Sequence, residues 1–319
     1  MAESDINQKV SLICTLKNEA SSLDDFIISL LSQSRTPDEI ILVDGGSDDK
    51  SVEIIESYSI KNDASIRLIV KDGINIAEGR NIAIKNAKYD IIASTDLGCT
   101  LDSEWLKYLI EPFEEDPKID VVAGWYKPKT SNTFERCLAD VTYPKLEKVL
   151  RDPANFLPSS RSVALKKKCW EKVGGYPEWL YTAEDTTFDL NLKRIGCNFA
   201  FAPKSFVYWK TRPSIKSALK QYYLYGKGDG QGRILSRSYL LTYFRYFSGL
   251  ILVLASFIDL RFLAILIGLV LIYFGTMVYF LSLNWKENLL LKLSILFLVD
   301  TVAIIGFSRG LLLKKQKKI

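Results

Sequence analysis

The stretch Val43-Asp44-Gly45-Gly46-Ser47-Asp48-Asp49 decides the fold class of this chain. It begins at the end of a β-branched apolar run, residues 39–43, which has the length and composition of a buried strand. A strand that ends in a carboxylate and then in glycines lets a ligand approach the backbone closely. In an open parallel sheet, ligands bind outside the carboxyl ends of the strands, so this stretch predicts a strand end and a binding site.

Strands and helices alternate on both sides of this stretch. Val10–Leu16, Ile66–Val70 and residues 90–95 are short β-branched runs and are predicted as further buried strands. Apolar residues at helical spacing occur in two segments: Leu23, Phe26, Ile27, Leu30 and Leu31, then Trp105, Leu106, Leu109, Ile110 and Phe113. Such alternation with short links predicts an α/β domain whose mostly parallel sheet is covered on both faces.

The charge balance of the 319 residues excludes several function classes. There are 42 Lys and Arg against 37 Asp and Glu, and four of the lysines lie in the last six residues. The rest of the chain is nearly neutral, which argues against nucleic-acid binding, because that affinity comes from phosphate neutralisation. The chain has no histidine, so Ser-His-Asp and Cys-His hydrolases, His-ligated zinc sites and histidine bases are excluded.

The cysteines and the N-terminal residues indicate the compartment. Five cysteines are scattered along the chain without a Cys-x-x-Cys pair: Cys14, Cys99, Cys137, Cys169 and Cys197. We interpret them as reduced, mostly buried thiols, and not as a disulfide framework or a metal site. The first apolar run is too short for a signal-peptide core, and residues 1–9 before it are polar. We therefore expect the N-terminal domain to stay in the cytoplasm.

Near residue 238 the composition changes to that of a membrane protein. Residues 262–283 are 22 residues without a charge, about 33 Å as a helix at roughly 1.5 Å per residue, enough to cross a bilayer core. Residues 239–258 and 289–307 are two further candidates, although they carry Arg245, Lys292 and Asp300, which are costly in lipid unless paired or snorkelling.

Two membrane topologies are compatible with the sequence. The lysine cluster at residues 314–318 predicts a cytoplasmic C-terminus, which requires an even number of crossings after a cytoplasmic domain. Either residues 239–258 are interfacial or re-entrant, or three helices cross and the tail breaks the rule. We favour three membrane helices, because the 20-residue segment is long enough and Arg245 lies within snorkelling reach of the cytoplasmic face.

Three predicted strand ends carry similar polar chemistry. Lys17-Asn18-Glu19 follows the first strand, Asp44 ends the second, and Asp96-Leu97-Gly98 follows the fourth. For a single residue such as Asp44, a turn residue or helix cap is the commoner role. The repetition at three strand ends favours a shared site. The first strand is not followed by Gly-x-Gly-x-x-Gly, so a nicotinamide-type dinucleotide site is not supported.

An ordered set of motifs resembles the family 2 inverting glycosyltransferases. The motifs are residues 10–19, Val43-Asp44-Gly45-Gly46-Ser47, Gly79-Arg80-Asn81, Asp96, Ala183-Glu184-Asp185 and residues 221–232. No single motif is specific, but their order and spacing are. The resemblance implies a GT-A fold, which is a Rossmann-like nucleotide-sugar-binding domain, and sugar transfer with inversion of the anomeric configuration.

The resemblance also assigns roles to individual residues. It implies that Asp44 binds the nucleotide base, that Asp96 helps hold a divalent metal (Mg²⁺ or Mn²⁺) on the diphosphate, and that Asp185, beside Glu184, is the catalytic base. The expected donor-binding set is Thr15, Asn18, Glu19, Asp44, Gly45, Lys71, Arg80, Asn81 and Asp96. Asp96-Leu97-Gly98 departs from the family's common Asp-x-Asp, which leaves open lost metal affinity, a different second ligand or weaker metal dependence.

The chemistry of sugar transfer makes these roles sensible. A departing nucleoside diphosphate develops negative charge, which a metal and a cationic donor such as Arg80 stabilise. An acceptor hydroxyl must lose its proton, and in a chain without histidine Asp185 is the simplest base. Each residue also has an ordinary structural role: Arg80 in a surface salt bridge, and Glu184 and Asp185 as acids favoured at a helix N-terminus.

Further candidates lie on the acceptor side. The candidate acceptor or gating residues are Ser159, Ser160, Arg161, Trp179, Gln221, Tyr225, Lys227 and Asp229. Aromatic and hydroxyl side chains suit sugars, although Trp is more often core packing. Residues 221–225 resemble the Gln-x-x-Arg-Trp motif of processive relatives, but with Leu and Tyr in place of Arg and Trp, which argues against a polymer-extruding synthase. The glycines of residues 226–230 predict a flexible gate or a linker.

We therefore predict a cytoplasmic GT-A domain at residues 1–212, an interfacial helix and gating linker at 213–238, and transmembrane helices with a basic tail at 239–319. The predicted enzyme is a multi-pass membrane hexosyltransferase. It moves a sugar from a UDP- or GDP-linked donor to a hydroxyl of a lipid-linked saccharide or surface glycan. The alternatives are a polyprenyl-phosphate sugar synthase, whose ionised acceptor needs no base, and a non-catalytic nucleotide-sugar-binding membrane scaffold.

Overall fold

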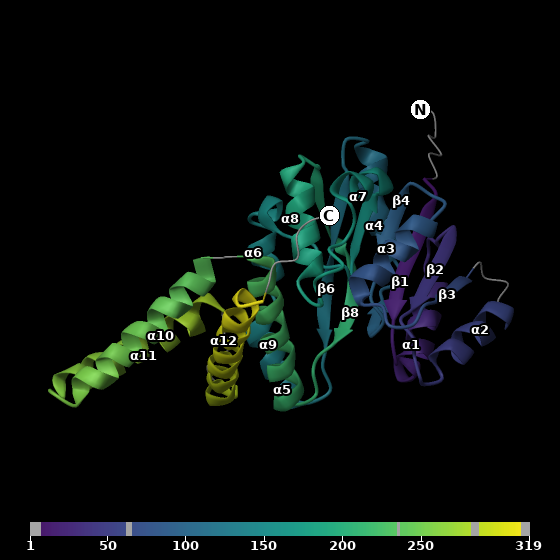
Figure 1. Cartoon of the computed structure of the whole chain (residues 1–319). Coiled ribbons are helices and arrows are strands. Elements are labelled where there is room, and N and C mark those ends of the chain that lie inside the picture. Colours follow the sequence, from purple (N-terminus) through teal and green to yellow (C-terminus); the bar gives the residue numbers. More distant parts are fainter. Residues whose placement is uncertain (1–7, 62–65, 235–236, 282–286, 314–319) are drawn as a thin grey trace. The chain divides into compact units, whose positions relative to one another are not determined.

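A computed structural model describes residues 8–61, 66–234, 237–281 and 287–313 (Figure 1). It contains two compact units, one made of Met1–Lys129 and Leu146–Lys210, the other of Thr130–Lys145 and Thr211–Ile319. The second unit therefore includes a segment from the middle of the chain. The basic tail and residues 282–283, which end one predicted membrane segment, lie outside the described residues. The division of the chain into residues 1–212, 213–238 and 239–319 stays a prediction.

The first unit is built on one eight-stranded sheet in the order β3-β2-β1-β4-β7-β6-β8-β5. The strands are β1 (Val10–Leu16), β2 (Glu39–Asp44), β3 (Ile66–Val70), β4 (Ile91–Ser94), β5 (Cys99–Leu101), β6 (Val121–Lys129), β7 (Val163–Lys166) and β8 (Phe199–Lys210). The strand pairs β1–β2, β2–β3, β1–β4 and β6–β8 are parallel, and β7 and β5 pair in the antiparallel sense. The predicted mostly parallel α/β sheet is confirmed.

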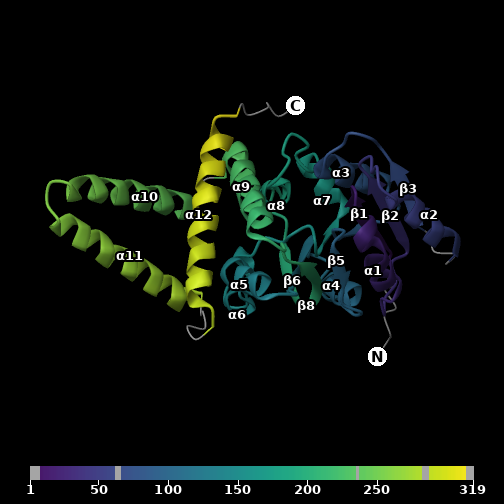
Figure 2. The same cartoon turned by 90° about the horizontal axis from the view of Figure 1, so that it is seen from below.

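Helices cover both faces of this sheet because the strands are apolar on both sides (Figure 2). The helices of the first unit are α1 (Ala20–Leu31), α2 (Ser51–Lys61), α3 (Ile76–Asn86), α4 (Trp105–Glu115), α6 (Leu146–Val149), the 3-10 turn η1 (Pro153–Asn155), α7 (Lys167–Val173) and α8 (Glu184–Arg194). Neighbouring residues of β1 enter different cores: Leu12 packs with α1 and α4, and Ile13 with α3 and α8.

The register of the strands brings the polar strand ends to one edge. Leu16 of β1 lies opposite Asp44 of β2, and Asp44 lies opposite Val70 of β3. On the other side of β1, Ser94 of β4 pairs with Ile13, so Thr95 and Asp96 continue beside the end of β1. The carboxyl ends of four parallel strands thus meet where the sequence predicts a shared site.

The second unit is helical. It consists of α5 (Thr133–Thr142), α9 (Ile215–Gly232), α10 (Arg237–Ser256), α11 (Arg261–Phe280) and α12 (Leu289–Leu311). α10, α11 and α12 are long and apolar enough to cross a membrane, and they correspond to the three predicted segments. α5, α9 and α12 share a core of Cys137, Leu138, Val141, Ala218, Ile295, Leu296 and Val299.

Glycines of α9 and α12 let the two helix backbones touch. A Cβ atom at Gly230 would lie 2.2 Å from the carbonyl oxygen of Phe307, and one at Gly310 would lie 2.1 Å from that of Lys227. Residues 226–230, predicted as a flexible gate or a linker, are instead part of α9. Glycine is a poor helix former in isolation, but here the close helix contact outweighs its intrinsic preference.

The charged residues of the predicted membrane segments are paired. Arg245 of α10 contacts Asp300 of α12 at 2.9 Å, and the Tyr273 hydroxyl of α11 donates to the same carboxylate at 2.9 Å. Lys292 of α12, buried, contacts Asp140 of α5 at 2.7 Å. Pairing of this kind is the condition under which charged side chains are tolerated in lipid.

Candidate active site at the carboxyl edge of the sheet

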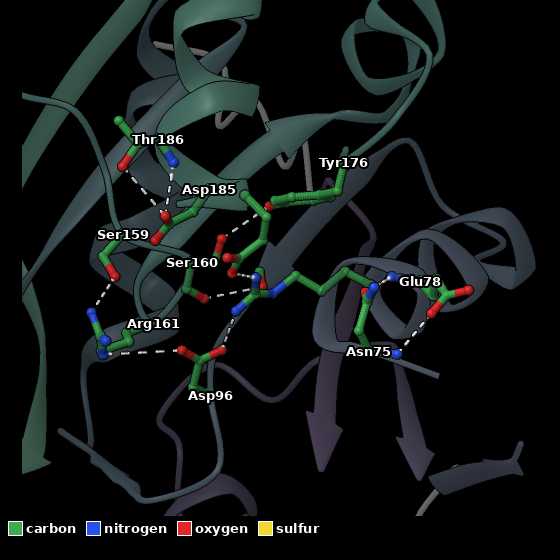
Figure 3. A network of polar contacts seen from close by, with 12 residues as sticks. Asn75, Glu78, Asp96, Ser159, Ser160, Arg161, Tyr176, Asp185 and Thr186 are labelled. Carbon is green, nitrogen blue, oxygen red and sulfur yellow. Dashed lines mark hydrogen bonds and ion pairs between the residues drawn. The ribbon is translucent and has the colours of Figure 1, made fainter. Parts of the chain in front are cut away.

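Arg80 is the centre of a buried ionic network (Figure 3). Its side chain is 2 % exposed, and its two terminal nitrogens donate to Asp96 at 2.6 Å and to Glu184 at 2.7 Å. Arg80 therefore does not form the surface salt bridge that is its ordinary structural alternative, because its guanidinium is buried. Charge-assisted bonds of this length are among the stronger polar contacts in proteins.

The position of Arg80 follows from the start of α3. The Asn75 side chain caps this helix by accepting from the backbone of Glu78, and the Glu78 carboxylate accepts from the backbone of Asn75 in return. At Gly79, a Cβ atom would lie 2.7 Å from the Thr15 methyl carbon, so only glycine lets α3 approach β1 this closely. This packing places Arg80, the next residue of α3, near the carboxyl end of β1.

Four carboxylates share the neighbourhood of this single buried arginine. Glu184 and Asp185 open α8, and Asp189, also buried, follows one turn later. Burial would lower the pKa of Arg80, but the charges of Asp96 and Glu184, with that of Asp185, raise it well above its ordinary value. The acids around Arg80 thus keep its guanidinium positively charged.

The acids in this network have raised pKa values. Burial, and then repulsion by Asp185, raise the pKa of Glu184 to about 7 although Arg80 opposes the shift. Burial and the charge of Asp185 also raise the pKa of Asp189 well above its ordinary value. Raised values of this kind are typical of functional sites, and paired structural networks also produce them.

Asp185 is more accessible than its neighbours. It is partly exposed, whereas Glu184 and Asp189 are buried. One of its oxygens accepts from the backbone of Thr186 at 2.7 Å, and a carboxylate has further acceptor positions at which it can receive a proton. Figure 3 shows Asp185, Ser160 and Asp96 gathered in one region of the first unit.

Arg161 lies on the other side of Asp96. Its Nε atom is 4.0 Å from the second Asp96 oxygen, and its guanidinium stacks 3.7 Å from the centre of the Trp209 ring. It also donates to the Ser159 hydroxyl at 2.6 Å. Ser160 contacts the Tyr176 hydroxyl at 3.2 Å. The Ser-rich break predicted on the acceptor side is thus next to Asp96.

Asp44 is buried and satisfied by its own turn. One of its oxygens accepts from the backbones of Gly46 at 2.9 Å and Ser47 at 2.8 Å. Its carbonyl accepts from the backbone of Lys71 at 2.9 Å. Its other carboxylate oxygen accepts from the Ser47 hydroxyl at 2.5 Å, so both oxygens of this fully buried side chain are engaged by the turn. Asp44 therefore stabilises the turn after β2, and its binding of the nucleotide base stays a prediction.

The loops after β1 and β2 are held together. Asn18 has a left-handed backbone (φ 57°), and its side chain accepts from the backbone of Asp48 at 2.9 Å. The backbone of Glu19 donates to the Ser51 hydroxyl at 3.0 Å, and that of Gly45 to the carbonyl of Leu16 at 2.9 Å. These contacts place the predicted donor-binding residues of both loops side by side.

Asn81 organises the loop that leads to α8. Its oxygen accepts from the Tyr176 backbone at 2.8 Å and from the Trp170 indole at 2.9 Å. Its nitrogen donates to the Tyr176 carbonyl at 2.9 Å and to Glu178 at 2.9 Å. Trp179, in the same loop, is half-buried. The structure thus gives Asn81 a loop-positioning role, and its predicted donor contact stays a prediction.

The remaining candidates lie in the second unit. Gln221 donates to the Tyr225 hydroxyl at 2.6 Å, and Asp229 accepts from the Tyr239 hydroxyl at 2.6 Å. The backbone of Lys227 lies against Gly306 and Gly310. These residues join α9 to its own neighbours, and their acceptor or gating roles stay predictions.

Two residues of the network were missed from the sequence. Asp189 lies one helical turn after Asp185, a spacing that signals a shared helix face. Tyr176 is buried, stacks on Phe188 with ring centres 4.0 Å apart, and lies 5.4 Å from the Arg80 guanidinium. Asp189 was visible as a spacing, whereas no local pattern distinguishes Tyr176 from a core aromatic.

The donor set around Asp96 fits a hard divalent cation. Asp96 offers carboxylate oxygens at a strand end, and such oxygens are the ligands that a hard divalent cation prefers. Mg²⁺ usually binds through one or two carboxylates together with substrate phosphates and water, so a single Asp is compatible with a metal that the donor helps to hold. Asp96 also contacts Arg80 directly, so metal and arginine would share this carboxylate.

Comparison with known proteins identifies the family. The model of glycosyl transferase family 2 matches residues 11–171, half of the chain. This chain is a family 2 glycosyltransferase. The model of glycosyl transferase family group 2 matches residues 99–298 of the same glycosyltransferase and extends into the helical unit.

Curated relatives of this glycosyltransferase are polysaccharide synthases by name. It is 23% identical over 238 residues to a poly-beta-1,6-N-acetyl-D-glucosamine synthase of Staphylococcus epidermidis, covering 73% of the chain and 57% of the relative. The synthase of Staphylococcus aureus strain COL is 23% identical over 239 residues, with the same coverage. The chain therefore spans little more than half the length of these relatives.

Solved structures confirm the GT-A-like fold of the glycosyltransferase. A mannosyltransferase from Pyrobaculum calidifontis, in complex with GDP-Man and Mn²⁺, has a TM-score of 0.66 at 16% identity over 95% of the chain and 87% of its own. TarS 1-349 of S. aureus with UDP-GlcNAc has a TM-score of 0.51 at 18% identity, covering 69% of the chain and 66% of its own.

Proposed function

We propose that this glycosyltransferase moves a sugar from a UDP- or GDP-linked donor to a hydroxyl of a lipid-linked saccharide or surface glycan, with inversion. The family supports sugar transfer, and solved neighbours bound to UDP-GlcNAc and GDP-Man support a nucleotide-sugar donor. Three apolar helices that follow the catalytic segment support an acceptor held at a bilayer. The enzyme is then a multi-pass membrane protein whose catalytic domain, residues 1–212, faces the cytoplasm.

The donor would lie at the carboxyl edge of the sheet. Asp44 and the linked loops that carry Asn18 and Glu19 supply acceptors and backbone groups for the nucleoside. The metal, Mg²⁺ or Mn²⁺, would be held by Asp96 and would neutralise charge on the departing diphosphate. Arg80 and Arg161, on the two sides of Asp96, add positive charge directed at the same group.

Asp185 would remove the proton of the acceptor hydroxyl. The observation that carries this role is the partial exposure of Asp185 in a group of acids whose other α8 members are buried. A partly exposed carboxylate reaches an incoming alcohol, whereas Glu184 is engaged by Arg80 at 2.7 Å. Glu184 acts in this scheme as the acid that holds Arg80 in position.

The substitution Asp185→Asn tests the base. We expect it to reduce kcat about 10²- to 10⁴-fold, because Asn keeps the shape but accepts no proton. The control is Asp25→Asn in α1, whose side chain is 76% exposed, and this control should match wild type. The assay is diphosphate release by the full chain in native membranes, with UDP- and GDP-sugars and membrane lipid acceptors.

Three outcomes are separable. Near-normal transfer by the Asp185 variant contradicts the base and favours an ionised phosphate acceptor, as in polyprenyl-phosphate sugar synthases. Transfer that is lost in the variant while donor binding is retained supports the proposal. No turnover by wild type with any donor, metal and acceptor contradicts the proposed activity itself.

A further inference from the structure

A second cluster of metal-binding side chains lies at the opposite edge of the sheet. Asp120, Cys169 and Cys197 place their ligand atoms within 4.8 Å of one another. Asp120 precedes β6, Cys197 precedes the parallel strand β8, and Cys169 follows the antiparallel strand β7. All three therefore lie at the amino ends of β1 and β4, away from Asp96. The residues that the structure describes contain no other such group.

The backbone around this cluster is fixed. Asp120 and Asn198 are joined by two bonds: the Asp120 backbone donates to the Asn198 carbonyl at 2.9 Å, and the Asn198 backbone donates to the Asp120 carboxylate at 3.2 Å. Cys197 adjoins Asn198, and Cys169 is buried in α7. Cys169 thus lies on a helix, and the two loop residues are held next to the first residues of β6 and β8, so the three ligands are positioned by neighbouring elements.

We propose that Asp120, Cys169 and Cys197 bind one Zn²⁺ ion, which revises the sequence-based interpretation of Cys169 and Cys197 as thiols outside any metal site. Zinc–sulfur and zinc–oxygen bonds of about 2.3 and 2.1 Å in a tetrahedral site separate the ligand atoms by roughly 3.5–3.8 Å, within the span observed here. Two sulfur ligands select a thiophilic ion over the hard Mg²⁺ expected at Asp96. Water completes the fourth position, since Asp120 and Cys197 are partly exposed.

Charge balance at the cluster is compatible with this ion. Binding releases one proton from each thiol, so Zn²⁺ with two thiolates and one carboxylate carries one negative charge. Lys166 and Lys168 lie 3.7 and 3.5 Å from the Asp120 carboxylate and compensate that charge. In the absence of zinc, the same lysines neutralise Asp120.

The ion would join segments that lead to the active site. Cys169 belongs to α7, which is followed by the loop that Asn81 holds, and Cys197 follows the end of α8, whose first turn carries Asp185. The expected role is therefore structural: zinc connects both ends of the segment that carries the acids.

Cobalt and zinc titrations of the full chain in detergent test the site. After chelation and dialysis, Co²⁺ should give the ultraviolet thiolate charge-transfer and visible bands of a tetrahedral site, and Zn²⁺ should abolish them at one equivalent. Saturating Zn²⁺, about 100 times its Kd, should raise the Tm by about 5 °C or more. The variant Cys169→Ala with Cys197→Ala should lose the bands and the rise.

The control variant Cys137→Ala removes a buried thiol of the second unit and should keep both signals. Mn²⁺, which suits the acids of the active site, should produce no thiolate band. The proposal is overturned if wild type gives no band, if the double variant gives the same one, or if mass spectrometry of protein purified with zinc finds a Cys169–Cys197 disulfide and no bound metal.

Discussion

The two units of this glycosyltransferase differ in how their buried charged side chains are paired. In the first, Arg80 lies among four acids, two of which, Glu184 and Asp189, have raised pKa values, and Arg161 lies on the other side of Asp96. In the second, Lys292 has Asp140 and Arg245 has Asp300, one acid for each cation. Matched charges hold helices together, whereas a group of neighbouring acids is accommodated by proton uptake, as the raised pKa values of Glu184 and Asp189 indicate. This difference is typical of a ligand-binding network in the first unit and of structural ion pairs in the second.

The largest effect should follow from removal of the central cation. Arg80→Met leaves the buried Glu184 without its cation, and Asp96 with Arg161 alone at 4.0 Å, which costs about 3–5 kcal/mol. We expect the Tm in detergent to fall by about 6 °C or more, and sugar transfer to be lost. Thermal unfolding and diphosphate release measure the two effects.

A second variant separates charge from packing. Adding Glu184→Gln to Arg80→Met removes the buried acid that has lost its cation and should recover part of the lost Tm, but no transfer. If Arg80→Met unfolds within about 1 °C of wild type, the acids around Arg80 do not depend on its charge for stability, and the comparison with the second unit fails.

A smaller and asymmetric effect is expected from the matched pair Lys292–Asp140. Asp140→Asn strands an ammonium that is 3% exposed, at a cost of about 3 kcal/mol, while Lys292→Met strands a carboxylate that is 42% exposed and can be solvated. Asp140→Asn should therefore lower the Tm by several degrees more than Lys292→Met. Equal losses, or the reverse order, would show that burial does not decide the cost of breaking this pair.

The smallest effect is a pH dependence of the first unit. Burial and Asp185 raise the pKa of Glu184 from 4.5 to about 7, so between these values the folded chain holds a proton that the unfolded chain has lost. Stability from this group is complete below pH 4.5 and declines as the pH rises to 7, by about 1–3 kcal/mol.

Glu184→Gln removes this titration and serves as the reference. The Tm of wild type relative to Glu184→Gln should decrease from pH 4.5 to 7, measured by thermal unfolding in matched buffers. Asp189 titrates in both proteins, and because Glu184 contributes to its raised pKa, the difference reports Glu184 together with its coupling to Asp189. A difference that is constant or increases with pH is incompatible with the raised pKa.

Much of the first unit could be predicted because its signals are local. The strands β1 and β3 have the bounds that their β-branched runs predicted, and the apolar spacings of α1 and α4 identify the helices. The meeting of polar strand ends follows from parallel pairing, so the proximity of Asp96 to the ends of β1 and β2 was also accessible.

What could not be predicted depends on contacts between distant parts of the chain. Asp120, Cys169 and Cys197 are isolated in sequence, and nothing local indicates that they converge. Likewise, Asp140 and Lys292 belong to segments that only the folded chain brings together. The helical state of residues 226–230 follows from contact with α12 rather than from propensity. The periodicity of apolar residues identifies single helices and strands, but it does not predict which of them contact one another.

The place of α5 has a practical consequence for truncation of the chain. This helix lies between β6 and β7 in sequence, yet Cys137, Leu138 and Val141 pack against Ile295, Leu296 and Val299 of α12. Cutting the gene after Lys210 would therefore leave an apolar helix surface in water and favour aggregation. A soluble fragment for crystallisation needs residues 130–145 replaced by a short polar linker in addition to the C-terminal cut.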